Sequence, residues 1–315
     1  MSKLQEIYWG NLDWLQSKTF LLCRTGSHAY GTNLPTSDED FKGICCPPKE
    51  YFLGFTKIFE QAEQHNPDLT IYDIRKYFRL AADNNPNILE MLYGTEEDHF
   101  PNQTDKQFRS ATLLLENRDY FLSKKVQWSF SGYAMAQLKR LKSHRNWLLD
   151  PPKMLPTRKA FNLPESTLIP ADQLAIAGQA IGLDDNFIEL LRAERAYLQA
   201  QKNWVQYQEW KKSRNPQRAE MEARFGYDGK HAMHLVRLMR MAKEILETRR
   251  VVVKRPDYKE LLSIRNGAWT YDQLIEWAER SDEDLKQIAK TSSLPETPNR
   301  EALNHLCQAI VETWI

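Results

Sequence analysis

The chain has 315 residues, with 43 Lys and Arg residues against 42 Asp and Glu residues, and a formal net charge of +1. Hydrophobic residues make up 42% and charged residues 27%, a composition that excludes an intrinsically disordered or collagen-like protein. The length favours two domains with buried cores. Because the charge is balanced, a nucleic-acid partner has to be argued from local groups of residues.

The sequence indicates a cytoplasmic protein without a membrane partner. No apolar run reaches the roughly 18 residues that a membrane span needs, and the N-terminal residues MSKLQEIYWG lack the pattern of a signal peptide. The four cysteines include the adjacent pair Cys45 and Cys46 and show no C-x-x-C spacing for zinc. They are typical of buried small residues in a reducing compartment. The sequence leaves the oligomeric state open.

The first predicted elements are strands at residues 19–25 and 38–46. Residues 69–73 form a third predicted strand, and the apolar spacing after it predicts a helix from Ile74. Pro86 ends this pattern and is suited to open the next helix. The N-terminal part is therefore expected to contain a small sheet.

From about residue 105 onward, apolar residues recur every three to four positions, which predicts helices over most of the chain. Residues 150–170 hold several prolines and few apolar residues, which predicts a long irregular loop. We therefore expect an α+β fold, with a sheet-containing catalytic domain at residues 1–110 and a mostly helical domain at residues 111–315.

The clearest chemical signal comes from Asp38 and Asp40, which lie on the second predicted strand. Because side chains alternate along a strand, both carboxylates are expected on the same side. Mg²⁺ prefers such oxygen ligands and keeps positions for waters and substrate phosphates, as metal-assisted phosphoryl or nucleotidyl transfer requires. A polar turn before a strand is the alternative explanation of the same residues.

Gly26 and Ser27 directly follow the first predicted strand. Glycine permits close approach of the backbone to a ligand, and Ser27 adds a hydroxyl and a backbone N–H. The pair therefore predicts a small phosphate-binding turn. A strand, a Gly-Ser pair and a later Asp-x-Asp on a second strand are together far more specific than Asp-x-Asp alone, and they favour the catalytic interpretation of Asp38 and Asp40.

These segments resemble the signature of the DNA polymerase β nucleotidyltransferase superfamily, in which a hydrophobic residue, Gly, and Gly or Ser precede Asp-x-Asp. The blocks GSHAYGTNLPTSDEDFKGI, YDIRKYFRLAADNNPNILEML, GYDGKHAMHLVRLM and SLPETPNREALNHL are similar to its predicted nucleotidyltransferase family of bacteria and phages. The resemblance implies a small mixed sheet, three carboxylates that hold two Mg²⁺ ions, and a helical domain. It also implies attack of an acceptor hydroxyl on the α-phosphate of an NTP, with release of pyrophosphate. The matching positions are Gly26, Ser27, Asp38 and Asp40.

The third carboxylate has more than one candidate. Asp68 and Asp73 border the third predicted strand and face opposite sides if that strand is regular, so only one of them can join the pair. Asp73 is a candidate catalytic residue, with a cap for the helix at Ile74 as an equal alternative. Asp68 is a candidate metal ligand, with a solvated turn after Pro67 as the alternative. Glu63 is a further possibility.

A second group of candidates lies on a predicted helix in the C-terminal half. Lys230, His234 and Arg237 are spaced by four and three positions and so share one face. Three basic groups near a helix start suit a triphosphate, so we expect them to bind the nucleotide; a solvated stripe is the alternative. Glu90 interrupts an apolar run, which predicts an Arg or Lys partner with a structural role.

Several basic segments of the helical part lie near tryptophans, including Trp147 and Trp210. Basic residues interleaved with aromatic residues can bind a nucleic-acid backbone and stack on its bases, although a packed aromatic stripe has the same pattern. The sequence thus predicts an Mg²⁺-dependent nucleotidyltransferase that moves an NMP from an NTP, with ATP favoured, to an acceptor hydroxyl, with an RNA or tRNA 3′ end favoured. A protein AMP-transferase and a non-catalytic nucleic-acid-binding module are the alternatives.

Overall fold

The computed structural model describes residues 12–65, 67–100, 104–166, 182 and 184–315. Contacts divide the chain into two compact units. One unit contains the residues up to 139 together with residues 229–315, and the other contains residues 140–228. The C-terminal helices therefore fold into the same unit as the N-terminal sheet. The expected domain boundary at residue 110 stays a prediction.

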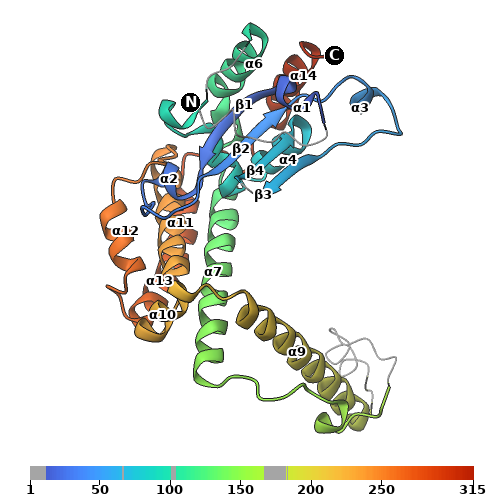
Figure 1. Cartoon of the computed structure of the whole chain (residues 1–315), viewed down its shortest axis with the longest axis vertical. Coiled ribbons are helices and arrows are strands. Elements are labelled where there is room, and N and C mark those ends of the chain that lie inside the picture. The colour runs from blue at the N-terminus through green and yellow to red at the C-terminus, as the bar shows by residue number, and fades with distance from the viewer. Residues whose placement is uncertain (1–11, 66, 101–103, 167–181, 183) are drawn as a thin grey trace. The chain divides into compact units, whose positions relative to one another are not determined.

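The first unit contains a four-stranded mixed sheet with the strand order β1-β2-β4-β3 (Figure 1). β2 pairs antiparallel with β1 and parallel with β4, and β4 pairs antiparallel with β3. The small mixed sheet and the helices after it confirm the expected α+β fold. The strands are β1 Thr19–Thr25, β2 Asp40–Cys45, β3 Gln61–His65 and β4 Asp68–Asp73.

Each face of the sheet is covered by apolar packing. One face contributes alternating residues, including Leu22, Phe41 and Ile71, to a buried cluster that also contains Leu15 of α1. Helices that follow β4 pack on the opposite face, where the Tyr77 hydroxyl donates to the Ile88 carbonyl at 3.0 Å. These elements are α1 Leu15–Lys18, α4 Ile74–Ala82, α5 Pro86–Leu89 and η2 Glu90–Leu92.

The helix α11, Gly229–Thr248, lies at the centre of the helical part of the first unit (Figure 1). It is mostly buried and packs against α12 and α13, while α14 packs against α4 and α6. The remaining elements of this unit are α2 Gly26–Tyr30, α3 Glu50–Leu53, η3 Glu96–Asp98, α6 Asp105–Glu116, η4 Arg118–Phe121, α12 Tyr258–Arg265, α13 Tyr271–Thr291 and α14 Arg300–Glu312.

The second unit is helical. The Trp147 indole donates to Asn203 at 2.8 Å, and Arg158 forms a two-bond ion pair with Glu194. The described part of the predicted proline-rich loop is irregular apart from one short turn of helix, and its residues 167–170 lie outside the described residues. No described helix is long and apolar enough to cross a membrane. The elements are the end of α7 Lys125–Leu149, η5 Arg158–Phe161, α9 Asp185–Ser213 and α10 Pro216–Phe225.

Candidate active site

The end of β1 and the beginnings of β2 and β4 lie together at one end of the sheet. Thr25 is the partner of Asp40 across β1 and β2, and Asp40 is the partner of Asp68 across β2 and β4. Neighbouring strands lie about 4.8 Å apart, and directly paired residues point to the same face. The carboxylates of Asp40 and Asp68 are therefore neighbours on one face of the sheet.

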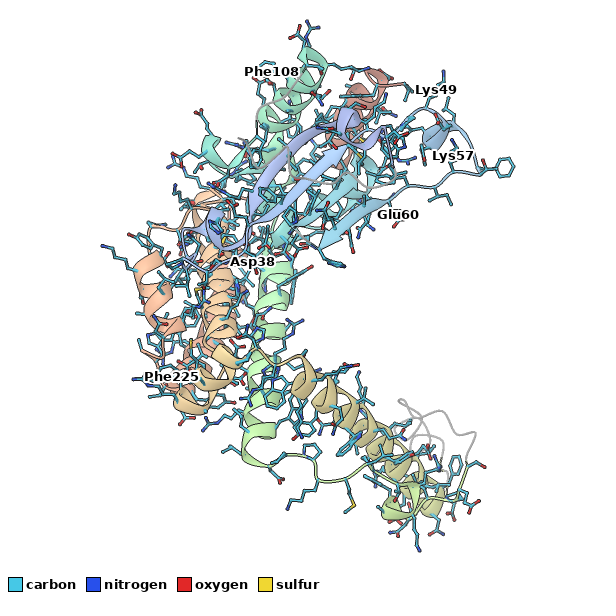
Figure 2. All side chains as sticks on the ribbon, in the orientation of Figure 1. Asp38, Lys49, Lys57, Glu60, Phe108 and Phe225 are labelled. Carbon is cyan, nitrogen blue, oxygen red and sulfur yellow. The ribbon has the colours of Figure 1, made fainter. Side chains whose placement is uncertain are left out.

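Asp38 lies just before β2 rather than on it, at the same end of the sheet (Figure 2). It is exposed, whereas Asp40 is half-buried. Burial raises the pKa of Asp40, and the negative charges of Asp68 and Asp38 raise it further, against the opposing effects of Lys230 and Lys42. The three carboxylates therefore repel one another. Carboxylate oxygens are the ligands that a divalent cation such as Mg²⁺ prefers, so a bound cation would relieve this repulsion.

Asp73 lies at the other end of β4, where it is the partner of Cys45 at the end of β2. It lies five positions along the strand from Asp68, which corresponds to about 16 Å. Its carboxylate is buried, accepts the backbone N–H groups of Arg75 and Lys76, and forms an ion pair with Arg75 at 2.8 Å. The structure thus places Asp73 as the cap of α4, the alternative that the sequence left open, and does not bring it together with Asp68 and Asp40.

Glu63, the further candidate for the third carboxylate, lies on the edge strand β3. It is the partner of Thr70, two positions along β4 from Asp68, and it is exposed. Because β4 separates β3 from β2, Glu63 is farther than Asp68 from the Asp38 and Asp40 carboxylates. Asp68 is thus the candidate that the sheet places beside Asp40.

Gly26 lies directly against the carboxylate of Asp40. Its φ is +69°, in the left-handed region, and a Cβ built on it would lie 2.2 Å from Asp40 Oδ2. A side chain at this position is therefore incompatible with the observed place of Asp40. Ser27 follows on α2 and is half-buried, and its carbonyl accepts the Thr32 N–H at 2.9 Å. The Gly-Ser turn predicted from the sequence thus lies beside the carboxylate group.

A chain of polar contacts holds the segment that carries Asp38 and Asp40. Glu39, between the two, lies 3.8 Å from the guanidinium of Arg24 on β1. Arg24 also donates to the buried carboxylate of Asp98 at 2.9 Å and 3.0 Å. Sequence reasoning missed Arg24 and Asp98, because their pairing joins residues that are 74 positions apart. The local signal was the position of Arg24 on the strand that ends at the Gly-Ser turn.

Lys42 is a second residue near the site that sequence reasoning missed. It lies two positions after Asp40 on β2, so its side chain is on the same face, and its Nζ donates to the Asn87 carbonyl at 3.3 Å. Burial lowers the pKa of Lys42, while the charges of Glu90, Asp40 and Asp68 oppose that shift. The signal in the sequence was strand alternation, which places residue 42 on the same side as residue 40.

The three basic residues predicted on one face of α11 have different environments. The charge of Lys230 acts on Asp40, and the ring of His234 meets that of Tyr30 edge to face, with centroids 6.5 Å apart. Burial lowers the pKa of His234 well below its usual range, and the charges of Arg237 and Lys230 lower it further. His234 is therefore neutral near pH 7. Of the three basic residues, Lys230 is the one whose charge acts on the Asp40 carboxylate.

Arg237 differs most from its expected role. Its side chain is 3% exposed and forms an ion pair with Glu90, whose side chain is also 3% exposed. The expected basic partner of Glu90 is thereby confirmed. Because the charge of Arg237 is already paired in a buried place, the geometry does not support the expectation that it binds a triphosphate.

The protein has a small mixed sheet with carboxylates at one end, beside a Gly-Ser turn. This arrangement agrees with the class of protein that the sequence resembles, the nucleotidyltransferases of the polymerase β type. Residues 1–150 match the model of the RNA repair pathway DNA polymerase beta family. This match supports a polymerase beta-like nucleotidyltransferase family for the N-terminal part of the chain.

One curated relative is 30% identical over 130 residues, an uncharacterized 38.9 kDa protein in the nrdC-mobD intergenic region of Enterobacteria phage T4. The match covers 38% of this chain and 38% of the relative, so it spans well under half of either protein. No solved structure matches the chain significantly. The family match thus concerns the N-terminal part, which contains Gly26 and the carboxylates but not α11.

Proposed function

We propose that the protein is an Mg²⁺-dependent nucleotidyltransferase that moves a nucleoside monophosphate from an NTP to an acceptor hydroxyl. The observation that carries the proposal is the neighbourhood of Asp38, Asp40 and Asp68 at one sheet end, with Gly26 against Asp40. The family match to residues 1–150 supports the same reaction class.

In this proposal Asp38, Asp40 and Asp68 hold the metal ions. Two Mg²⁺ ions, when bound, lower the pKa of the acceptor hydroxyl and neutralise charge on the triphosphate. Asp68 also orients the attacking hydroxyl, whose oxygen forms a bond to the α-phosphorus. The bond from that phosphorus to the bridging oxygen breaks, pyrophosphate leaves with the bonding electrons, and the hydroxyl proton passes to solvent.

Gly26, Ser27 and Lys230 act on the triphosphate in this proposal. The Ser27 hydroxyl and the adjacent backbone bind the β- and γ-phosphates, and the ammonium group of Lys230 offsets their charge from α11. Asp40 and Lys230 already interact electrostatically, so a phosphate near the carboxylates is within the field of this cation. Arg237 and Asp73 have no direct part in the reaction.

The proposed acceptor is the 3′ hydroxyl of an RNA, and the tRNA 3′ end is one example. ATP is the first NTP to test. The description of the matching family, an RNA repair pathway, supports this choice. Basic residues near half-buried tryptophans in the second unit, such as Lys211 beside Trp210, are compatible with a nucleic-acid partner.

The test is incubation with Mg²⁺ and each α-³²P-labelled NTP, in turn with total RNA, with protein extract and with no acceptor. Label that enters RNA in the wild type and not in the Asp38→Ala/Asp40→Ala variant supports the proposal. Label in protein instead identifies an AMP-transferase of the same chemistry. No label in any mixture, with a folded protein that binds RNA, points to a non-catalytic binding module and contradicts the proposal.

A further inference from the structure

Tyr30, at the end of α2, is buried and contacts three separate segments. Its hydroxyl donates to Glu90 Oε2 at 2.5 Å, and the guanidinium of Arg237 lies 3.7 Å from the centroid of its ring. Its carbonyl accepts the Arg255 N–H at 3.0 Å. The short helix that begins with Gly26 and Ser27 is therefore held by η2, by α11 and by the segment that precedes α12.

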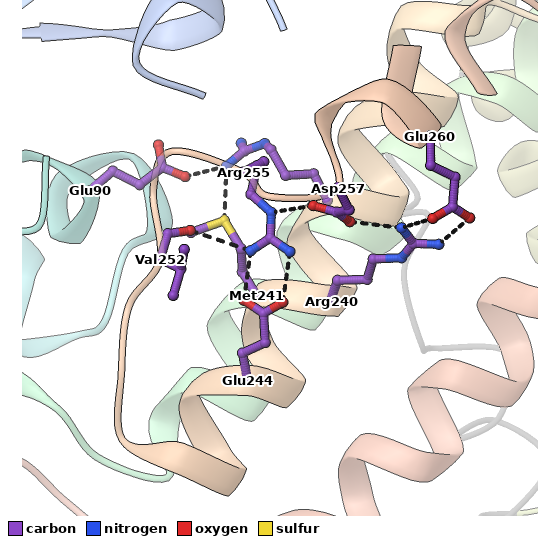
Figure 3. Close-up of polar contacts among 9 residues, drawn as sticks. Glu90, Arg240, Met241, Glu244, Val252, Arg255, Asp257 and Glu260 are labelled. Atoms are coloured by element: carbon purple, nitrogen blue, oxygen red, sulfur yellow. Dashed lines mark hydrogen bonds and ion pairs between the residues drawn. The ribbon is translucent and has the colours of Figure 1, made fainter. Parts of the chain in front are cut away.

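Two of the residues that contact Tyr30, Glu90 and Arg237, also form an ion pair with each other, and both side chains are buried. Figure 3 shows the place of Glu90. A buried ion pair gains little over apolar packing, but removal of either partner leaves an uncompensated charge. A rotation of α11 by one residue, about 100°, would separate Arg237 from Glu90. The pair therefore specifies one rotational setting of α11 against α2 and η2.

The setting of α11 determines where Lys230 lies. Lys230 precedes Arg237 by seven positions, which is close to two helical turns, so both side chains are on the same face. His234 lies between them on this face and meets the ring of Tyr30. Along this face of α11, Arg237 and His234 thus contact α2, the helix that carries Gly26 and Ser27. Lys230, in the first turn of α11, acts electrostatically on Asp40.

We propose that Tyr30, Glu90 and Arg237 are positioning residues, which hold α11 against α2 and thereby place Lys230 at the triphosphate. The inference rests on the proposed function. In this proposal the three residues touch neither substrate nor metal, and they act through Lys230.

A conservative variant tests this role with a direct binding measurement. Tyr30→Phe keeps the ring under Arg237 and removes only the hydrogen bond to Glu90. We expect the Kd for αβ-methylene NTP analogues with Mg²⁺, measured for all four bases by titration calorimetry, to rise about tenfold, the effect of losing one hydrogen bond to a charged group. Thermal unfolding of the same samples checks that the variant is folded at the temperature of the titration.

The matched control is Arg240→Lys on the same helix. Arg240 is paired with Asp257 and Glu260 rather than with Tyr30 or Glu90 (Figure 3). We expect this variant to lower the melting temperature without a change in analogue binding. A purely structural role for Tyr30 predicts the same behaviour for Tyr30→Phe, and that result would overturn the inference.

A double-mutant cycle with Lys230→Met tests whether Tyr30 acts through Lys230. Residues that act through a common group show non-additive effects, so Tyr30→Phe should weaken binding no further once Lys230 is absent. An equal loss in both backgrounds contradicts the inference and leaves the proposed function standing. A wild-type protein that binds none of the analogues contradicts both.

Discussion

The contact between Gly26 and Asp40 shows at the scale of single residues how the turn after β1 and the carboxylates depend on one another. The absence of a side chain at position 26 leaves the space that the Asp40 carboxylate occupies. Glycine also adopts the positive φ at this position without the strain that an L side chain would suffer. Two properties of glycine, conformation and size, are thus used at one position.

A pair of glycine variants separates these two properties. Gly26→Ala and Gly31→Ala both place alanine at a positive φ, +69° and +72°, but a Cβ at Gly31 meets nothing within 4 Å. Each should lower the free energy of unfolding by about 1–2 kcal/mol. Only Gly26→Ala should also lower kcat/KM for labelled transfer, by about 100-fold, because it displaces Asp40. Equal activity of the two variants would show that the clash with Asp40 is unimportant.

The assignment of the third carboxylate is tested by two further variants on β4. Asp68→Asn should lower kcat by about 100- to 1,000-fold, because it removes a charged group from beside Asp40. Asp73→Asn should leave kcat near that of the wild type, since asparagine caps a helix as well as aspartate, and should cost about 1 kcal/mol or less of stability through the lost ion pair with Arg75. Steady-state transfer and denaturant unfolding measure both effects; the reverse pattern would restore Asp73 as the third carboxylate.

At the scale of elements, the packing of α11 beside α2 buries the ring of His234 against that of Tyr30. Burial, Arg237 and Lys230 keep the folded-state pKa of this imidazole well below its usual range. The unfolded chain takes up a proton near pH 6.5, and the folded protein does not. The stability that depends on neutral His234 is therefore fully present above about pH 6.5 and is lost progressively as the pH falls below that value.

Denaturant unfolding between pH 7.5 and pH 5 measures this dependence. We expect the free energy of unfolding of the wild type to decline with falling pH more steeply than that of His234→Gln, because glutamine carries no titrating group. Identical slopes for the two proteins would contradict the assignment of a buried neutral imidazole.

Local patterns in the sequence were sufficient to predict some elements and insufficient for others. β1, β4 and α4 follow apolar runs and a helix-capping aspartate, so residues within each element determine them. β3 has the polar sequence QAEQH and was not predicted, because an edge strand exposes many of its side chains and shows no apolar run. Tertiary pairing with β4, rather than propensity, forms this strand.

The candidate site divides in the same way. Gly26, Ser27, Asp38 and Asp40 were predictable because they lie close together in the sequence. The choice between Asp68 and Asp73 required the parallel register of β2 and β4, which no local pattern specifies. Lys230 and Arg237 were predicted on one face, but their different environments depend on Glu90, which is 147 positions from Arg237.

At the scale of the whole molecule, the segments that form the first unit are not continuous in the sequence. The family match ends near residue 150, whereas α11 begins at Gly229. Residues 140–228, which form the second compact unit, come between these two parts in the sequence. The carboxylates thus lie in the matching segment, while Lys230 and the partner of Glu90 lie beyond it.

This order has a consequence for synthesis of the chain. Glu90 emerges from the ribosome 147 residues before Arg237, a delay of about 7 to 30 s at 5–20 residues per second. During that time the Glu90 carboxyl lacks its cationic partner and is costly to bury in charged form. Residues 140–228 are completed within the same interval. The first unit therefore acquires its final buried packing only after the second unit has been made.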